Sequence, residues 1–81
     1  MPRYFFDVTD SGGIHTDEVG LELPNMDAAI MEARRALADM TRESLVERSA
    51  ASLRIHIRDG TDGPVNLVVS VTTERPNGKS G

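Results

Sequence analysis

The chain has 81 residues, a formal net charge of −4 and no cysteine. A chain of this length forms one domain, because it can bury only roughly 60 to 65% of the surface that its unfolded form exposes. The absence of cysteine excludes a disulfide framework, a thiol nucleophile and cysteine-based zinc sites, and the acidic balance argues against a polyanionic partner.

The first predicted element is a strand over Arg3–Val8, which contains all three aromatic residues of the chain, Tyr4, Phe5 and Phe6. Neighbouring side chains of a strand point to opposite faces. We therefore expect Tyr4 and Phe6 in the core and Phe5 on the outer face of the sheet. The surroundings of Phe5 then need an explanation, because an aromatic ring is not expected to lie bare on a sheet.

A glycine-rich turn over residues 9–13 leads to a second predicted strand, Ile14–Leu23, antiparallel to the first. The second half of this strand alternates, with Val19, Leu21 and Leu23 on one face and Glu18, Gly20 and Glu22 on the other. The alternation predicts a regular hairpin.

Asn25 predicts the N-terminal cap of a helix that begins at Met26, because its side-chain oxygen can accept a hydrogen bond from an early helical N–H. The predicted core stripe of this helix repeats at steps of three and four residues: Met26, Ile30, Ala33, Leu37 and Met40. The helix is expected to end near Glu43 or near Arg48, since no residue in this region gives a sharp stop.

A second hairpin follows the helix. Its first strand alternates Leu53, Ile55 and Ile57 with Arg54, His56 and Arg58, and its second alternates Val65, Leu67, Val69 and Val71 with Asn66, Val68, Ser70 and Thr72. The turn between them covers residues 59–64. The domain is expected to span residues 1–75, with a flexible tail over residues 76–81.

The order β-β-α-β-β predicts a two-layer α+β fold, in which a four-stranded antiparallel sheet has one helix packed on one face. A single helix leaves the other face bare. That outer face is expected to carry Arg3, Phe5, Asp7, Glu18, Glu22, Arg54, His56, Arg58, Asn66, Val68, Ser70 and Thr72.

The bare face predicts an interface between two copies of the chain, with Phe5 and Val68 as a small apolar centre. Arg54 or Arg58 would reach an acidic residue such as Asp7 across a two-fold axis, which makes the patch self-complementary. We therefore expect a non-enzymatic homodimeric module for protein–protein interaction or regulation, without catalytic residues, cofactor or metal.

One alternative is a nucleic-acid-binding module. Single-stranded bases stack on aromatic residues of a basic sheet face, and the candidate residues here are Arg3, Phe5, Arg54, His56 and Arg58. The acidic total makes this the less favoured reading, since such proteins usually show a basic excess.

Another alternative is a metal or small-ligand site at the acidic hairpin. Its carboxylates are Asp7, Asp10, Asp17, Glu18 and Glu22. Their spacing does not match an EF-hand loop.

A cytoplasmic location without a membrane segment is expected. Asp7 and Asp10 interrupt any signal-peptide apolar region. No stretch approaches the roughly 20 apolar residues of a membrane span.

Two motifs carry a resemblance: the opening Met-Pro-Arg-Tyr-Phe-Phe-Asp-Val, and Asp-Glu-Val-Gly-Leu-Glu-Leu-Pro at residues 17–24. With them, the chain resembles over residues 1–75 a family of short bacterial proteins known only as a domain of unknown function. The resemblance implies no activity, cofactor or catalytic residue. It does imply which positions to inspect first: Tyr4, Phe5, Asp7, Asp17, Gly20 and Glu22.

Overall fold

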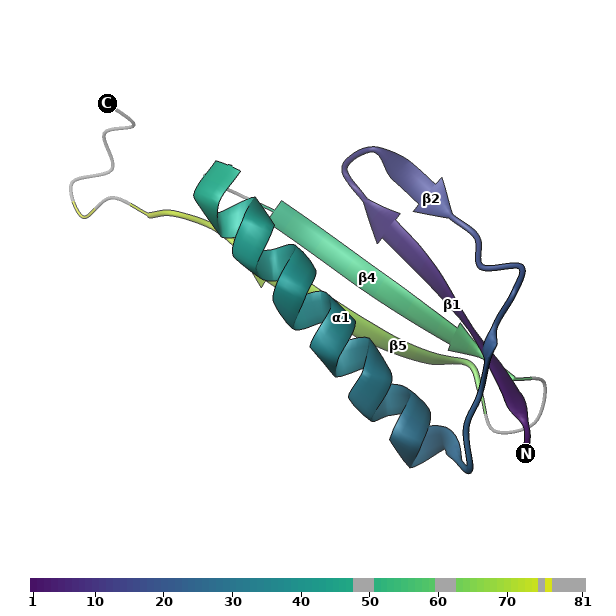
Figure 1. The fold of residues 1–81 in the computed structure, drawn as a ribbon. Coiled ribbons are helices and arrows are strands. Elements are labelled where there is room, and N and C mark those ends of the chain that lie inside the picture. Colours follow the sequence, from purple (N-terminus) through teal and green to yellow (C-terminus); the bar gives the residue numbers. More distant parts are fainter. Residues whose placement is uncertain (48–50, 60–62, 75, 77–81) are drawn as a thin grey trace.

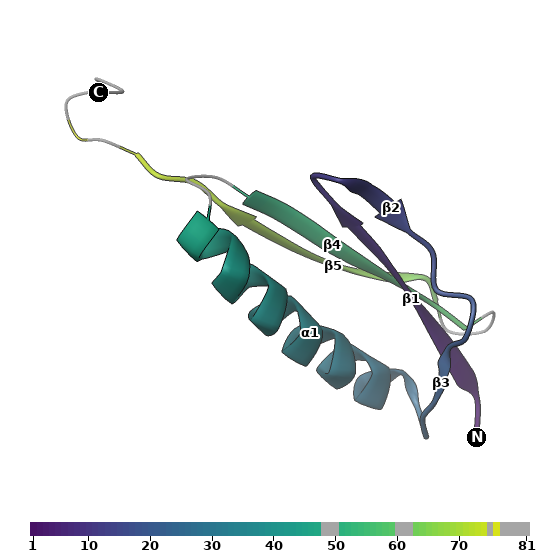
Figure 2. The ribbon, with the colours of Figure 1, turned by 45° about the horizontal axis from the view of Figure 1, so that its top comes forward.

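The computed structural model describes residues 1–47, 51–59, 63–74 and 76. They form an antiparallel sheet with one helix across one face (Figure 1), which confirms the predicted two-layer α+β fold. The elements in chain order are β1 (Arg3–Asp10), β2 (Gly13–His15), β3 (Leu21–Glu22), α1 (Met26–Glu47), β4 (Ala51–Arg58) and β5 (Val65–Val71). Figure 2 shows that the helix lies on one side of the sheet only.

The strands are arranged in the order β2-β1-β4-β5, and β3 also pairs with β1. Strands β1 and β4 are therefore central, and β5 forms an edge. Helix α1 packs against β4 and β5, so it covers the half of the sheet that these two strands form.

The prediction of one continuous second strand over Ile14–Leu23 is wrong, and the sheet has five strands instead of four. From the pair Val8 and His15 to the pair Tyr4 and Leu21, β1 advances four residues and its partner six. The partner therefore carries two extra residues, which leave the ladder over residues 16–20 and form a bulge. Alternation within a short segment cannot reveal such an insertion.

The bulge also changes the expected positions of the apolar residues in this segment. Leu23 packs against the core, but Val19 lies outside any strand and is 75% exposed. The predicted common face of Val19, Leu21 and Leu23 is therefore not formed.

The core lies between α1 and the inner face of the sheet. Its buried residues are Tyr4, Ala29, Ala33, Leu37, Leu53, Ile55 and Ile57, and the partly buried residues packed against them include Phe6, Val8, Met26, Ile30, Met40, Val65, Leu67 and Val69. The predicted core stripe of the helix is confirmed, with Ala29 as an addition. The alternation predicted for β4 and β5 is confirmed as well.

The helix begins as predicted. Asn25 Oδ1 accepts a hydrogen bond from the Ala28 N–H at 2.9 Å, which confirms the N-terminal cap. The helix continues past Glu43 to Glu47. Arg48, the later of the two expected ends, lies outside the described residues, as do residues 60–62 of the predicted turn and residues 77–81 of the predicted tail. Among the described residues, no helix is long and apolar enough to cross a membrane.

The close approach of α1 to the sheet predicts a large effect of added volume at Ala33, which is 1% exposed. Ala33→Leu should lower the free energy of unfolding by roughly 1 to 3 kcal/mol, because extra methylene groups in a filled core force side chains and backbone apart. Ala36→Leu, on the exposed side of the same helix turn, is the matched control and should change stability little. Equal effects in urea denaturation would contradict this account of the helix–sheet contact.

Candidate functional site

The outer face of the sheet carries most of the side chains that the sequence predicts there. Cross-strand pairing puts them in three rows: Phe5 with Arg58, then Asp7 with His56 and Asn66, then Thr9 with Arg54 and Val68. Arg3 pairs with Glu22 at one end. Two predicted members, Glu18 and Thr72, lie outside the strands.

Arg58 explains why Phe5 lies on the outer face. Its Nε donates to Asp7 Oδ2 at 2.7 Å, and its Nη2 donates to Asp7 Oδ1 at 3.1 Å and to the Asp17 carbonyl at 3.0 Å. Its guanidinium carbon lies 4.9 Å from the centroid of the Phe5 ring. A planar guanidinium can stack on a ring and bind a carboxylate with two hydrogen bonds at the same time. Phe5 is therefore partly covered by its own chain.

The Asp17 carboxylate holds the bulge against β1. Its Oδ2 accepts the Phe6 N–H at 3.0 Å, and its Oδ1 accepts the N–H groups of Val19 at 3.0 Å and Gly20 at 3.1 Å. The Asp17 N–H in turn donates to Asp7 Oδ1 at 2.9 Å. The bulge removes the strand partner of β1 at this point, and a part-buried backbone N–H needs an acceptor. A side-chain carboxylate supplies it.

Gly20 lets the chain return to the sheet after the bulge. Its φ is 75°, a conformation that residues with a Cβ rarely adopt. A Cβ at this position would lie 2.8 Å from Arg3 Cγ, 2.9 Å from Phe5 Cε2 and 3.0 Å from the Tyr4 carbonyl oxygen. Both the backbone angle and the crowding therefore require glycine.

The hydrogen bonds of this cluster keep its carboxylates ionised. The pKa of Asp7 is lowered mainly by the hydrogen bond from Arg58 and further by the Asp17 N–H, against the opposing effect of burial. For Asp17, burial is the largest single influence and raises the pKa, but the N–H groups of Gly20, Phe6 and Val19 together outweigh it, so its pKa is also lowered.

We call the group Phe5, Asp7, Asp17, Gly20 and Arg58 the hairpin clamp. It joins β1, β4 and the bulge through contacts within one chain, so its polar groups already have partners. Arg58 and Asp7, expected to meet across a two-fold axis, bind each other.

Phe5 and Val68, expected as one apolar centre, are not brought together. Their cross-strand neighbours on β4, Arg58 and Arg54, are four residues apart, which is about 13 Å along a strand.

The residues proposed for nucleic acid are also partly engaged. Arg3 Nη1 donates to the Val19 carbonyl at 2.9 Å, and its Nη2 lies 3.6 Å from Glu22 Oε1. His56 Nδ1 is 2.8 Å from Asn66 Oδ1. Nucleic-acid binding stays a prediction, with much of its predicted surface already held by intrachain bonds.

The acidic hairpin uses its carboxylates internally as well. Asp10 Oδ1 accepts the Gly12 N–H at 2.7 Å and lies 3.4 Å from His15 Nε2. That N–H lowers the pKa of Asp10. Within the part of the chain that the structure describes, no three histidine or acidic side chains form a group that could hold a metal ion.

The structure contains a surface that the sequence analysis missed, a groove of about 670 Å³ between α1 and β5. It is lined by Arg34, Leu37, Ala38, Thr41, Arg42, Leu45, Leu67, Val68 and Val69. Leu45 is 55% exposed and Val68 is 53% exposed. The available signal was an apolar residue off the core stripe, Leu45, together with a strand that has no charge over Val65–Val71.

A second hollow of about 460 Å³ lies at the far end of the helix. Its lining includes Asp10, Glu43 and Glu47 together with Ser44, Ser52 and Ser70. Met40, Leu53 and Val71 also line this hollow, but its three carboxylates make it more polar than the groove. The apolar groove is the better candidate for a contact with another molecule.

The Asp17 contacts predict a specific cost for Asp17→Asn. The amide nitrogen would replace one carboxylate oxygen and direct a donor at a backbone N–H, so the free energy of unfolding should fall by roughly 1 to 3 kcal/mol. Glu18→Gln removes a neighbouring exposed charge and is the control, with no change expected. Urea denaturation measures both, and a loss of the same size in the control would contradict the role assigned to Asp17.

The lowered pKa values of Asp7 and Asp17 predict an acid-sensitive clamp. A carboxyl whose pKa is lower in the folded state stabilises the fold above its unfolded pKa, about 3.9, and loses this contribution as the pH falls toward and through its folded pKa. The stability gap between the natural chain and Asp17→Asn should therefore be constant near neutral pH and narrow below about pH 4. A gap that stays constant into strong acid would exclude this explanation.

Comparison with known proteins finds one family that matches most of the chain. The profile of the domain of unknown function DUF6894 matches residues 3–74, a stretch that contains every residue of the hairpin clamp and the whole of β5. No curated protein and no solved structure matches the chain. The chain belongs to the family described as a domain of unknown function, DUF6894.

Proposed function

We propose that the protein is a non-enzymatic module for protein–protein interaction that binds its partner along β5 and the adjoining groove. The observation that carries this proposal is the nature of β5. It is the last strand of the order β2-β1-β4-β5, so among the described residues no strand pairs with its outer edge. An open edge presents a row of unpaired N–H and C=O groups, to which another strand can add.

The β5 edge lacks the usual protection against pairing. Residues Val65–Val71 contain no charge and no proline, and their register with β4 runs without a bulge from Val71 to Val65. Charges, prolines and bulges are the common devices that keep an edge strand from pairing. The absence of these devices over seven residues favours pairing of β5 with a strand of another molecule.

The groove beside β5 supplies side-chain contacts for an added strand. Its inner part is apolar, formed by Leu37, Leu67 and Val69, and Leu45 borders it from the helix. An added strand would direct every second side chain toward this apolar surface. Backbone pairing and apolar burial would then act together, as in other cases of strand addition.

The proposal predicts a contrast between two adjacent helix residues. Leu45 lines the groove and Val46, 84% exposed, does not. Leu45→Glu should abolish partner binding, because it places a carboxylate in the apolar contact, whereas Val46→Glu should leave binding unchanged. Immobilised natural chain and both variants are compared by affinity capture and mass spectrometry, after circular dichroism has shown equal folding.

The proposal is supported if a protein is retained by the natural chain and by Val46→Glu but not by Leu45→Glu. That protein can be a further copy of this chain. Identical capture by all three would contradict the proposed surface. Equal loss from both variants would point to the helix charge instead of the groove.

A further inference from the structure

We infer that the partner which fits β5 is a second copy of this chain, paired antiparallel about a two-fold axis at Val68 to give one continuous sheet. This inference rests on the proposed function and names the occupant of the same surface. Three features of the described residues support it: the symmetry of β5, the position of α1 over the sheet, and the residues on one flank of the helix.

The sequence of β5 suits pairing with itself. Val68 is the midpoint of Val65–Val71, so an antiparallel pair centred there uses all seven residues of both strands. Uncharged residues then face uncharged residues, and the repulsion between opposed like charges does not arise. Opposed residues of an antiparallel pair lie on the same face, so both helices would cover the same side of the joint sheet.

The position of α1 gives a suitable distance between the two helices. The helix packs against both β4 and β5, and strands are spaced by about 4.8 Å. The helix packs more extensively against β4 than against β5, so its axis lies between one and one and a half strand spacings from the two-fold axis. The two helix axes would then be about 10 to 14 Å apart, close enough for large side chains on the facing flanks to meet.

One flank of the helix is self-complementary in this arrangement. Met31, Ala38 and Leu45 are spaced by seven residues and therefore lie along one side of α1. Ala38 lines the same groove as Val68, so the axis at Val68 passes near Ala38. Helix α1 runs in the same direction as β5 (Figure 1), which makes the two helices antiparallel and brings Met31 opposite Leu45 of the second copy.

The exposure of these residues agrees with such a contact. Met31 is 51% exposed and Leu45 is 55% exposed, and the small side chain of Ala38 permits close approach at the crossing point. Small domains commonly gain stability from association, because their own core is limited. The core of the described residues contains seven buried side chains, to which this contact would add a second apolar layer.

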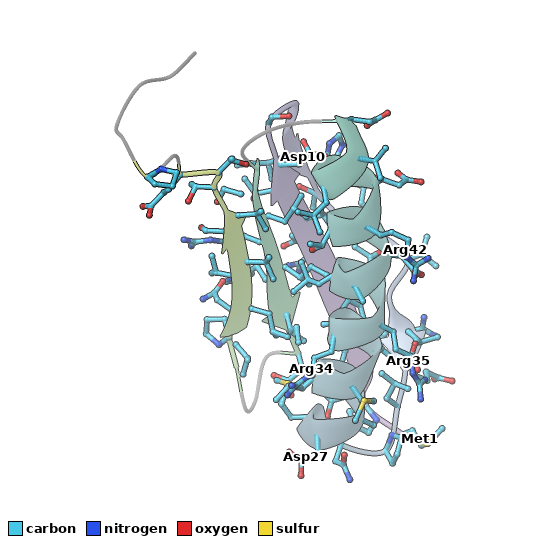
Figure 3. All side chains as sticks on the ribbon, turned by 90° about the vertical axis from the view of Figure 1, so that its left-hand side faces the viewer. Met1, Asp10, Asp27, Arg34, Arg35 and Arg42 are labelled. Atoms are coloured by element: carbon cyan, nitrogen blue, oxygen red, sulfur yellow. The ribbon has the colours of Figure 1, made fainter. Side chains whose placement is uncertain are left out.

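The charges of the groove distinguish a second copy from an acidic partner. Arg34 and Arg42 line the groove, and none of the described residues that line it carries a carboxylate. Figure 3 shows Arg34 on the strand side of α1 and Arg42 on the side away from the strands, where its Nη1 lies 3.7 Å from Asp39 Oδ1. Two copies bring arginines toward arginines, so added salt should strengthen self-association by screening. A contact with an acidic segment would weaken with salt.

The first test uses the absence of cysteine in the chain. Val68→Cys places two thiols opposite each other at the axis, at a spacing of about 4.5 to 5.5 Å between Cα atoms, which suits a disulfide. Mild oxidation should give a covalent dimer. Arg54→Cys is the matched control, since Arg54 is the cross-strand neighbour of Val68 on the same face of a central strand and should give at least tenfold less dimer.

The second test is a charge swap across the proposed axis. In sedimentation equilibrium at micromolar concentration, the natural chain should have twice the monomer mass, and Met31→Glu and Leu45→Lys should each weaken association at least tenfold. The double variant should recover it, because Glu at one position would face Lys of the second copy. The two positions are 14 residues apart in one helix, about 21 Å, so the recovery cannot arise within one chain.

The outcomes separate this inference from the proposed function. A monomeric natural chain, or equal disulfide formation by both cysteine variants, would overturn the second copy as the occupant. If the affinity capture then showed a different protein that binds the natural chain but not Leu45→Glu, the proposed interaction surface would be kept and its partner would be that protein. If the natural chain were monomeric and Leu45→Glu captured the same proteins as the natural chain, both the second copy and the proposed interaction surface would be overturned.

Discussion

The carboxylate of Asp17 is the contact on which the arrangement of this sheet depends. Residues 16–20 leave β1 without a strand partner at Phe6 on the side away from β4, and the Asp17 side chain accepts the N–H that would otherwise be unpaired. An unsatisfied buried N–H costs roughly 1 to 3 kcal/mol. The same carboxylate closes the bulge by accepting the Gly20 N–H. The backbone carbonyl of Asp17 accepts a hydrogen bond from Arg58. The Asp17 side chain therefore fixes the bulge and the adjacent strand, and its backbone carbonyl helps Asp7 to hold the arginine that covers Phe5.

This clamp divides the sheet into two unlike halves. On the β1 side, contacts inside the chain complete the edge through the bulge and the short strands β2 and β3. Arg58 occupies part of the outer face there. On the β5 side, the described residues contain no comparable cover, and an apolar groove lies beside the strand. The polar residues that the sequence marks as candidates are therefore engaged within the fold, and the surface proposed for a partner lies at the opposite edge.

The sequence patterns correctly predicted the features that depend on residues close together in the chain. The alternation of Tyr4, Phe5 and Phe6 correctly separated core from outer face, and Asn25 correctly marked the start of the helix. The bulge was missed because the alternation of a few residues does not show how many residues of that segment lie opposite a given length of β1. The pair Asp7 and Arg58 spans 51 positions, and only the order of the strands brings its members together. The groove depends on where the helix lies over the sheet, which the periodicity of the helix does not determine.

The distribution of side chains around α1 links these observations to the open edge. Its core stripe is satisfied by the sheet, yet Met31 and Leu45 are large apolar residues about half exposed on another flank. A helix that served only its own sheet would gain solubility from charged residues at both positions, as it does at Glu32 and Asp39. Leu45 instead lines the groove beside β5, an edge strand without charge or proline, and Met31 follows on the same flank of the helix. Helix flank and edge strand are thus suited to being covered together by the same neighbour.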